Sequence, residues 1–88
     1  MTPYAPLYLN CFTAPAINVG GYTALSNYGT LIHEADAAKA CWLDAACGSV
    51  LAYAGLNFLR GTSGNAVAVP GATLRVKLSS CPEVASLP

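Results

Sequence analysis

The chain has 88 residues, of which 55% are hydrophobic and 9% charged, and its four Lys and Arg balance its four Asp and Glu to a net charge of zero. Without an excess of positive charge it is poorly suited to a phosphate backbone, so the composition argues against a nucleic-acid partner and against an anionic membrane surface. This length predicts one domain, residues 1–88, with a small core. Because a net charge near zero favours association, we expect an oligomer or part of a larger assembly.

The first ten residues are rich in Pro and Tyr. Closely spaced prolines disfavour a helix, so residues 1–10 are expected to form an extended N-terminal arm. Alternation of apolar with other residues predicts a strand over 6–13. The arm is expected either to dock on a neighbouring protein or to be a frayed end. Residues 30–33 are predicted to form a short strand, and His33 is expected to be a surface or helix-cap histidine.

The clearest helix is predicted over about residues 34–45, which are rich in Ala, Leu and Lys and contain no Gly, Pro or β-branched residue. Ala37, Cys41 and Ala45 share one small apolar face, which lets the helix lie close to a sheet. The acidic residues of this segment are expected to form a solvated helix face.

A run of antiparallel strands is predicted after the helix. The expected elements are a strand at 48–54, a tight turn at 55–57, a returning strand at 58–60, a loop at 61–65, a short strand at 66–69 that ends at Pro70 and Gly71, a strand at 73–78 and a C-terminal tail at 82–88. In the strand at 73–78, Leu74, Val76 and Leu78 are expected to face the core, with Arg75 and Lys77 in solvent. The fold class predicted is α+β, a mostly antiparallel sheet with one helix packed on it.

Four cysteines, at positions 11, 41, 47 and 81, allow three pairings. A metal site is the competing use, but Cys-x2-Cys spacing is absent and the chain has one histidine. We therefore expect disulfides, and favour Cys11–Cys81 with Cys41–Cys47. Disulfides imply an oxidising location, either extracellular or on a virion surface. No secretory signal or membrane span is recognised in the sequence. Three explanations are left open: the signal was removed, the protein is released by cell lysis, or the cysteines are reduced.

Catalytic chemistry is not expected. His33 is the one candidate base, no Gly-x-Ser-x-Gly elbow occurs, and most carboxylates lie on one short helix rather than across a cleft. The glycine pairs lack the context of a phosphate-binding loop. We predict that the chain is not an enzyme and uses no cofactor or metal.

Aromatic side chains are the better indication of function, because tyrosine combines an apolar ring with one hydroxyl and suits protein and sugar contacts alike. The predicted binding residues are Tyr4, Tyr8, Tyr22, Tyr28 and Asn65, the last in the loop at 61–65. Trp42 and Tyr53 are expected to be core residues.

The pattern Ala37-x3-Cys41-x5-Cys47-x5-Tyr53, followed by Asn57-Phe-Leu-x-Gly and a late Cys81, resembles the PAN/apple domain. The resemblance implies that Cys41 and Cys47 correspond to a bonded helix–strand pair and Cys11 and Cys81 to the outer pair. A third family disulfide is absent, because its positions correspond to Ala37 and to Phe58 or Leu59. The resemblance further implies a binding fold without catalytic residues, which holds proteins or carbohydrates by its sheet and loops.

Two functions are therefore predicted. The first is a structural or interaction module that docks on a larger protein assembly through its arm and sheet, for which a virion decoration or cement protein fits the small size and low charge. The alternative is a secreted adhesion module of the PAN type that binds carbohydrate or protein.

Overall fold

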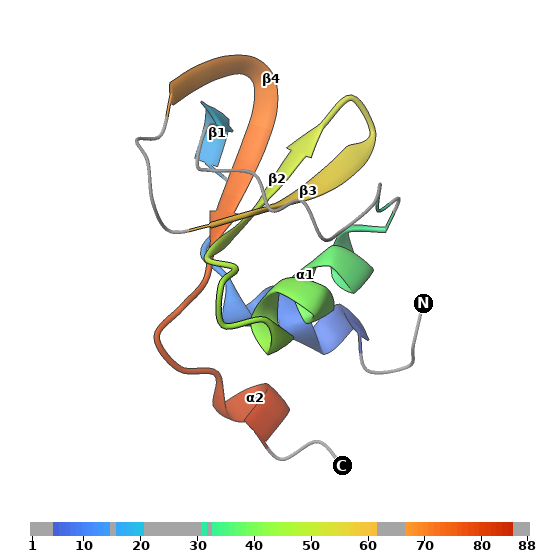
Figure 1. Cartoon of the computed structure of the whole chain (residues 1–88), viewed down its shortest axis with the longest axis vertical. Helices are drawn as coiled ribbons and strands as arrows, with labels where there is room; N and C mark the ends of the chain where they lie inside the picture. Colours follow the sequence, from blue (N-terminus) through green and yellow to red (C-terminus); the bar gives the residue numbers. More distant parts are fainter. Residues whose placement is uncertain (1–4, 15, 21–30, 32, 62–66, 86–88) are drawn as a thin grey trace.

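The structure is a computed structural model and describes residues 5–14, 16–20, 31, 33–61 and 67–85. Its elements in chain order are a 3-10 helix η1 (Ala5–Cys11), β1 (Ala16–Gly20), α1 (Glu34–Leu43), β2 (Ser49–Tyr53), β3 (Leu56–Arg60), β4 (Val67–Val76) and a one-turn helix α2 (Pro82–Ala85). The four strands form one antiparallel sheet in the order β1-β4-β2-β3. Figure 1 shows the helical elements gathered below this sheet. The predicted α+β class is confirmed.

Helix α1 lies close to the sheet because the side chains on its inner face are small. Ala37, Ala38 and Cys41 are fully buried, and they share the main core cluster with Val50 of β2 and Leu59 of β3. The helix ends at Leu43, earlier than predicted, because Asp44 adopts an extended backbone with ψ 114°. Ala45 therefore lies beyond the helix and is exposed.

The strand predicted over residues 6–13 is wrong, and most of the expected extended arm is the helix η1. The burial pattern has a period of three rather than two: Tyr8 and Cys11 are buried, whereas Leu7 and Asn10 are exposed. Residues three apart are aligned in a 3-10 helix, so this spacing places Tyr8 and Cys11 on one inner face. Prolines are compatible with the start of a helix because the first turn needs no backbone N–H there.

Strands β2 and β3 form a hairpin, as predicted, but the chain turns at Ala54 and Gly55 rather than at 55–57. Both turn residues have positive φ, 55° for Ala54 and 78° for Gly55. Two consecutive positive φ values are typical of the type I′ turn, whose twist matches that of the strands. Ala54 is the unfavourable member, because a Cβ is strained in this region.

Replacing Ala54 by Asn is expected to raise the free energy of unfolding by about 0.5–1 kcal/mol, because Asn tolerates the left-handed conformation that Ala resists. The matched change Gly55→Ala should lower it by about 1 kcal/mol. Nothing lies within 4 Å of a Cβ built at Gly55, so this variant reports backbone strain without a clash. Urea unfolding followed by Trp42 fluorescence measures both, and a destabilised Ala54→Asn protein would contradict the assigned turn.

Strand β4 continues through Pro70 and Gly71, so the prediction that these residues end a short strand is wrong. On one side of them Thr73 pairs with Ile17, and on the other Ala68 pairs with Val19, with a shift of register between. The extra residues of β4 form a bulge in which Gly71 adopts φ 85°. A bulge accommodates proline, because its residues leave the ladder of hydrogen bonds. The strand bends here, as Figure 1 shows.

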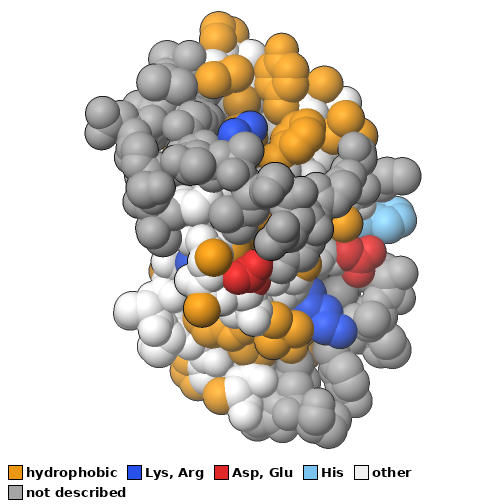
Figure 2. Space-filling view, viewed as in Figure 1, with side chains coloured by type: hydrophobic (Ala, Val, Ile, Leu, Met, Phe, Trp, Pro, Cys, Tyr) orange, Lys and Arg blue, Asp and Glu red, His pale blue; other side chains and the backbone are white. Residues whose placement is uncertain are grey.

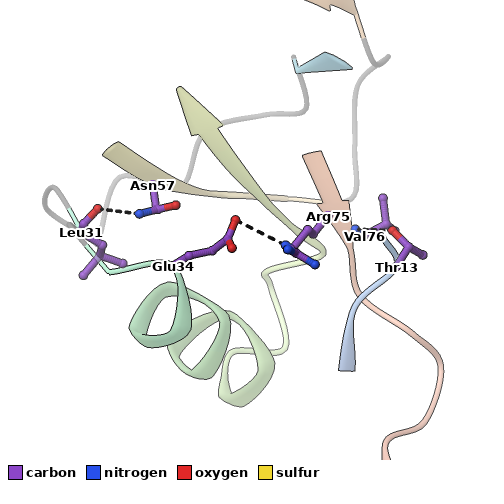
Figure 3. Close-up of polar contacts among 6 residues, drawn as sticks. All are labelled: Thr13, Leu31, Glu34, Asn57, Arg75 and Val76. Atoms are coloured by element: carbon purple, nitrogen blue, oxygen red, sulfur yellow. Dashed lines mark hydrogen bonds and ion pairs between the residues drawn. The ribbon is translucent and has the colours of Figure 1, made fainter. Parts of the chain in front are cut away.

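The predicted faces of residues 73–78 are only partly correct. Leu74 is buried at 3% exposure, but Val76 and Leu78 are each 39% exposed. Arg75 pairs with Val50 and so lies on the face that carries α1, where its Nε is 3.3 Å from a carboxylate oxygen of Glu34 (Figure 3). Alternation gives the period of a strand but not which face receives the helix. Here the face with the basic residues receives it.

The first and last described elements, η1 and α2, are joined in the helical layer. The tail predicted at 82–88 begins with α2, whose Val84 is buried, and Asn10 Nδ2 donates a hydrogen bond of 2.8 Å to Glu83. Residues 86–88 lie outside the described part.

Of the strand predicted at 30–33, Leu31 forms a single bridge with Asn57. The backbone and side-chain N–H groups of Asn57 both donate to the Leu31 carbonyl (Figure 3).

Two disulfides close the core. Cys11 is bonded to Cys81 and Cys41 to Cys47, which is the pairing favoured from the sequence. All four cysteines belong to the main core cluster. The first bond joins η1 to the segment before α2, and the second joins α1 to the segment before β2. The first bond therefore links two parts of the helical layer, and the second ties that layer to the chain entering the sheet.

Candidate interaction surface

Of the five residues predicted to bind a partner, one lies in the part of the chain that the structure describes. Tyr4, Tyr22, Tyr28 and Asn65 lie outside the described residues, so their roles stay predictions. Tyr8 is 7% exposed and belongs to the main core cluster, so it packs inward and offers little contact area. His33 is exposed at the N-cap of α1 and makes no side-chain capping hydrogen bond, as expected for a cap-region histidine.

The two aromatic residues predicted to be core differ. Trp42 is half-buried and packs against the main core cluster, with its ring edge-on to Phe12 at 6.3 Å between centroids. Tyr53 is 45% exposed, so its assignment to the core is wrong. It stands at the last position of β2, three residues after Val50, so its ring lies on the sheet face opposite α1, which the helical layer does not cover.

Tyr53 lies at an end of the sheet where two turns of the chain meet. It pairs with Leu56 across the hairpin, and a Cβ built at Gly71 would lie 4.0 Å from its Cε1 atom, so the hairpin turn and the β4 bulge are neighbours. We call this region the sheet tip, defined as residues 53–56 and 69–71. Ala54, Gly55, Pro70 and Gly71 are exposed, and Leu56 and Val69 are half-buried. Figure 2 shows hydrophobic side chains gathered at the top, over this end of the molecule.

The structure describes all eight charged residues, and none of them belongs to the sheet tip. Glu34, Asp36, Lys39, Asp44, Arg60, Arg75, Lys77 and Glu83 belong either to the helical layer, to the segment after β4, or to the two strand rows farthest from the hairpin turn. Arg60 pairs with Ser49, and Arg75 pairs with Val50, at the opposite end of β2 from Tyr53. No residue of the sheet tip is charged, but on the face that carries Tyr53 the Arg60 guanidinium lies 5.9 Å from the centroid of the Phe58 ring, one strand row from the tip.

Of the other four large hydrophobic residues that are exposed in the described part of the chain, three adjoin a charged residue in sequence, whereas Leu7 does not. Leu43 is 67% exposed and directly precedes Asp44, while Val76 and Leu78 flank Lys77. The sheet tip differs from these positions because an apolar partner can cover it without removing a charge from water, which costs several kcal/mol for an unpaired group. Sequence reasoning missed this site, although the available signal was that residues 45–74 contain a single charged residue, Arg60.

The surroundings of Lys77 perturb its charge, and the physical cause is clear. Its ammonium donates a 3.0 Å hydrogen bond to the Asp44 carbonyl and lies 5.5 Å from the centroid of the Trp42 ring. Burial lowers the pKa of Lys77 below its ordinary 10.5, and the charge of Asp44 partly opposes this shift. The Lys77 side chain thus packs its methylene groups along the edge of the core and places its ammonium near the Trp42 ring. The prediction that it points freely into solvent is wrong.

The lowered pKa of Lys77 predicts the direction in which the stability of the fold changes with pH. The unfolded chain holds this proton more tightly than the folded chain, so stability should rise with pH between the lowered pKa and 10.5. The free energy of unfolding, measured from pH 8 to 11, should increase in the wild type relative to Lys77→Met, which lacks the titrating group. The gain is small because much of the ammonium is in contact with water. A difference that shrinks with rising pH would contradict this assignment.

No pocket is found in the described part of the chain, and its His, Cys, Asp and Glu side chains do not gather into a metal-binding group. None of the helices described there is long and apolar enough to cross a membrane. Comparisons with protein-family models, with curated proteins and with solved structures find no match.

Proposed function

We propose that this chain is a non-enzymatic interaction module that docks on a larger protein assembly through its sheet tip. The observation that carries the proposal is the exposure of Tyr53 at an end of the sheet without charged residues. Each square ångström of apolar surface covered there contributes about 25 cal/mol, with no ionic group to desolvate. Tyrosine also supplies a rigid contact with one hydroxyl, which is why it is enriched in interfaces.

A virion decoration or cement protein is the assembly component that we favour. The small size, the low charge and the two disulfides support it, because such a protein must remain folded on an exposed surface outside the cell. An extracellular or virion-surface location follows from the same reasoning. The role of the predicted N-terminal arm in docking stays a prediction for residues 1–4, which lie outside the described residues.

The test uses particles purified from the source that produces the chain. Oxidised, purified protein is mixed with particles stripped of it, and the mixture is sedimented. The wild type should co-sediment at a saturable ratio, whereas Tyr53→Asp should stay in the supernatant because burying its carboxylate costs more than the contact returns. Leu43→Asp places the same charge on an exposed residue of α1 and should co-sediment like the wild type. A wild-type chain that does not co-sediment with the particles would refute the proposal.

A PAN-type module that binds carbohydrate or protein is the second candidate. What favours it is the arrangement of the disulfides, with Cys41–Cys47 joining helix and strand and Cys11–Cys81 joining the two ends, as the resemblance implies. Its predicted contacts are Tyr22, Tyr28 and Asn65. A glycan array probed with wild type, Tyr22→Ala and Tyr28→Ala tests it: specific binding that both variants lose supports the module, and an array without a hit counts against carbohydrate.

A further inference from the structure

We propose that the Cys11–Cys81 disulfide is a redox switch. A thiol reductant opens it before it opens Cys41–Cys47, and residues 79–85, which include α2, then detach from η1 while the rest of the chain stays folded. This inference is independent of the proposed function. Three observations carry it: the access to the sulfur atoms, the few contacts that hold α2, and the backbone hydrogen bonds that precede the segment.

The two disulfides differ in how closely their sulfur atoms are covered. Cys41 and Cys47 are 0% and 1% exposed, and their Sγ atoms lie 3.6 and 3.3 Å from one backbone carbonyl, that of Ser49. Cys81 is 8% exposed and follows two exposed serines in a segment without regular secondary structure. Reduction requires a thiolate to approach one of the two sulfur atoms, so access decides which bond reacts first. The bond that a reductant reaches from solvent is Cys11–Cys81.

Apart from this bond, few contacts hold residues 79–85 in place. Val84 is the one buried side chain of α2, and the polar contact to another described element is the exposed hydrogen bond of 2.8 Å from Asn10 to Glu83. Figure 1 shows α2 at the lower edge of the molecule. Ordering seven residues costs conformational freedom at each position, which exceeds what one buried valine and one exposed hydrogen bond return. The disulfide is therefore what keeps the segment against η1.

The chain before this segment is held without the help of either sulfur atom. The Leu78 N–H donates to the Cys11 carbonyl at 2.8 Å, and the Thr13 N–H donates to the Val76 carbonyl at 2.9 Å. These backbone hydrogen bonds join the residues around the end of η1 to those around the end of β4. They persist when the disulfide opens, so the segment becomes free from the residue after Leu78 onwards.

Opening the bond is a two-electron exchange with a dithiol such as dithiothreitol. A thiolate of the reductant attacks the Cys81 Sγ, the S–S bond breaks, and Cys11 leaves as a thiolate that takes a proton from water. The second thiol of the reductant then attacks the mixed disulfide, which releases Cys81 as a thiol and leaves the reductant as a disulfide. In a cell two glutathione molecules supply the same two electrons, so the segment is free in a reducing compartment and held in an oxidising one.

The experiment treats the oxidised protein with dithiothreitol in the cold, alkylates the free thiols at intervals and maps the labelled peptides. Cys11 and Cys81 should be alkylated at least tenfold faster than Cys41 and Cys47. A disulfide pair at 41 and 47 that opens first, or at the same rate, overturns the inference.

Nuclear magnetic resonance relaxation of ¹⁵N-labelled protein follows the segment itself. When the first bond opens, the backbone order parameters of residues 79–85 should fall from about 0.85 to below about 0.6, whereas those of β2 should not change. The near-ultraviolet circular dichroism of Trp42 should also be kept. A segment that stays ordered after reduction overturns the inference, as does loss of the Trp42 signal in the same step, which would mean that the whole chain unfolds.

Two variants separate the disulfide from the packing of α2. Cys11→Ala/Cys81→Ala should show the mobile segment without any reductant. Val84→Ala keeps both bonds and removes the buried side chain, and its segment should stay ordered. A mobile segment in oxidised Val84→Ala would assign the holding role to the valine and overturn the inference. If the double alanine variant does not fold, the reduction of the wild type still decides between these outcomes.

Discussion

Replacing Cys11 and Cys81 together with alanine is expected to lower the free energy of unfolding by about 4 kcal/mol, the largest single effect predicted for this chain. The bond joins residues 70 positions apart, so without it the unfolded chain regains most of its conformational freedom. Total stability of a domain this size is about 5–10 kcal/mol, and the variant is therefore expected to be only marginally folded at 37 °C. Alanine avoids the buried hydroxyl that serine would introduce.

The control is the double variant Cys41→Ala/Cys47→Ala, which opens a bond between residues six positions apart. Its expected cost is about 2 kcal/mol by the same loop-closure reasoning. Both disulfides lie in one core cluster, with every cysteine at 8% exposure or less, so losses in packing are similar for the two variants. Guanidinium unfolding monitored by Trp42 fluorescence gives both values. Equal costs, or a larger cost for the short bridge, would show that packing rather than chain entropy dominates.

Leu59→Ala is expected to cost about 2–5 kcal/mol, the second-largest effect. Leu59 is 3% exposed and belongs to the core cluster between the sheet and α1. Its neighbours in that cluster include Ala37 and Ala38, whose methyl groups are too short to fill the space that the leucine leaves. We therefore expect about 3–4 kcal/mol rather than the lower end of the range, since the cost rises with the volume of the remaining cavity.

The same substitution at Leu43 provides the comparison. Leu43 is 67% exposed at the end of α1, so Leu43→Ala removes little buried surface and should change the free energy of unfolding by less than about 0.5 kcal/mol. Thermal and chemical unfolding of the two variants measure the contrast. Similar losses at both positions would mean that α1 is not packed against the sheet through this cluster.

The helix, the hairpin and the disulfides could be predicted because each depends on local composition or on few alternatives. An Ala-rich run without Gly or Pro specifies α1 by its own propensity. The hairpin of β2 and β3 follows from two apolar runs separated by a glycine-containing turn. Four cysteines allow three pairings, and joining the chain ends was a reasonable choice among them.

The remaining features depend on tertiary contacts that periodicity does not contain. Leu7, Leu9 and Cys11 alternate like a strand, yet Tyr8 and Cys11 are the residues that the core requires, and these fit a 3-10 helix. Arg75 lies on the helix-facing side because it pairs with Val50 of β2, and Glu34 of α1 is 3.3 Å from its Nε there. Tyr53 resembles a core aromatic in sequence, and its exposure follows from standing at the end of its strand, which only the arrangement of the sheet reveals.

The Cys11–Cys81 bond has a consequence for how the molecule responds to proteases. It encloses nearly the whole chain in one covalent ring. A single cut of the backbone at any point between the two cysteines, the loops and the sheet tip included, leaves both fragments attached to each other. Nicked protein would keep its mass under non-reducing conditions and separate into pieces only when a reductant is added, so a single cut need not release any part of it.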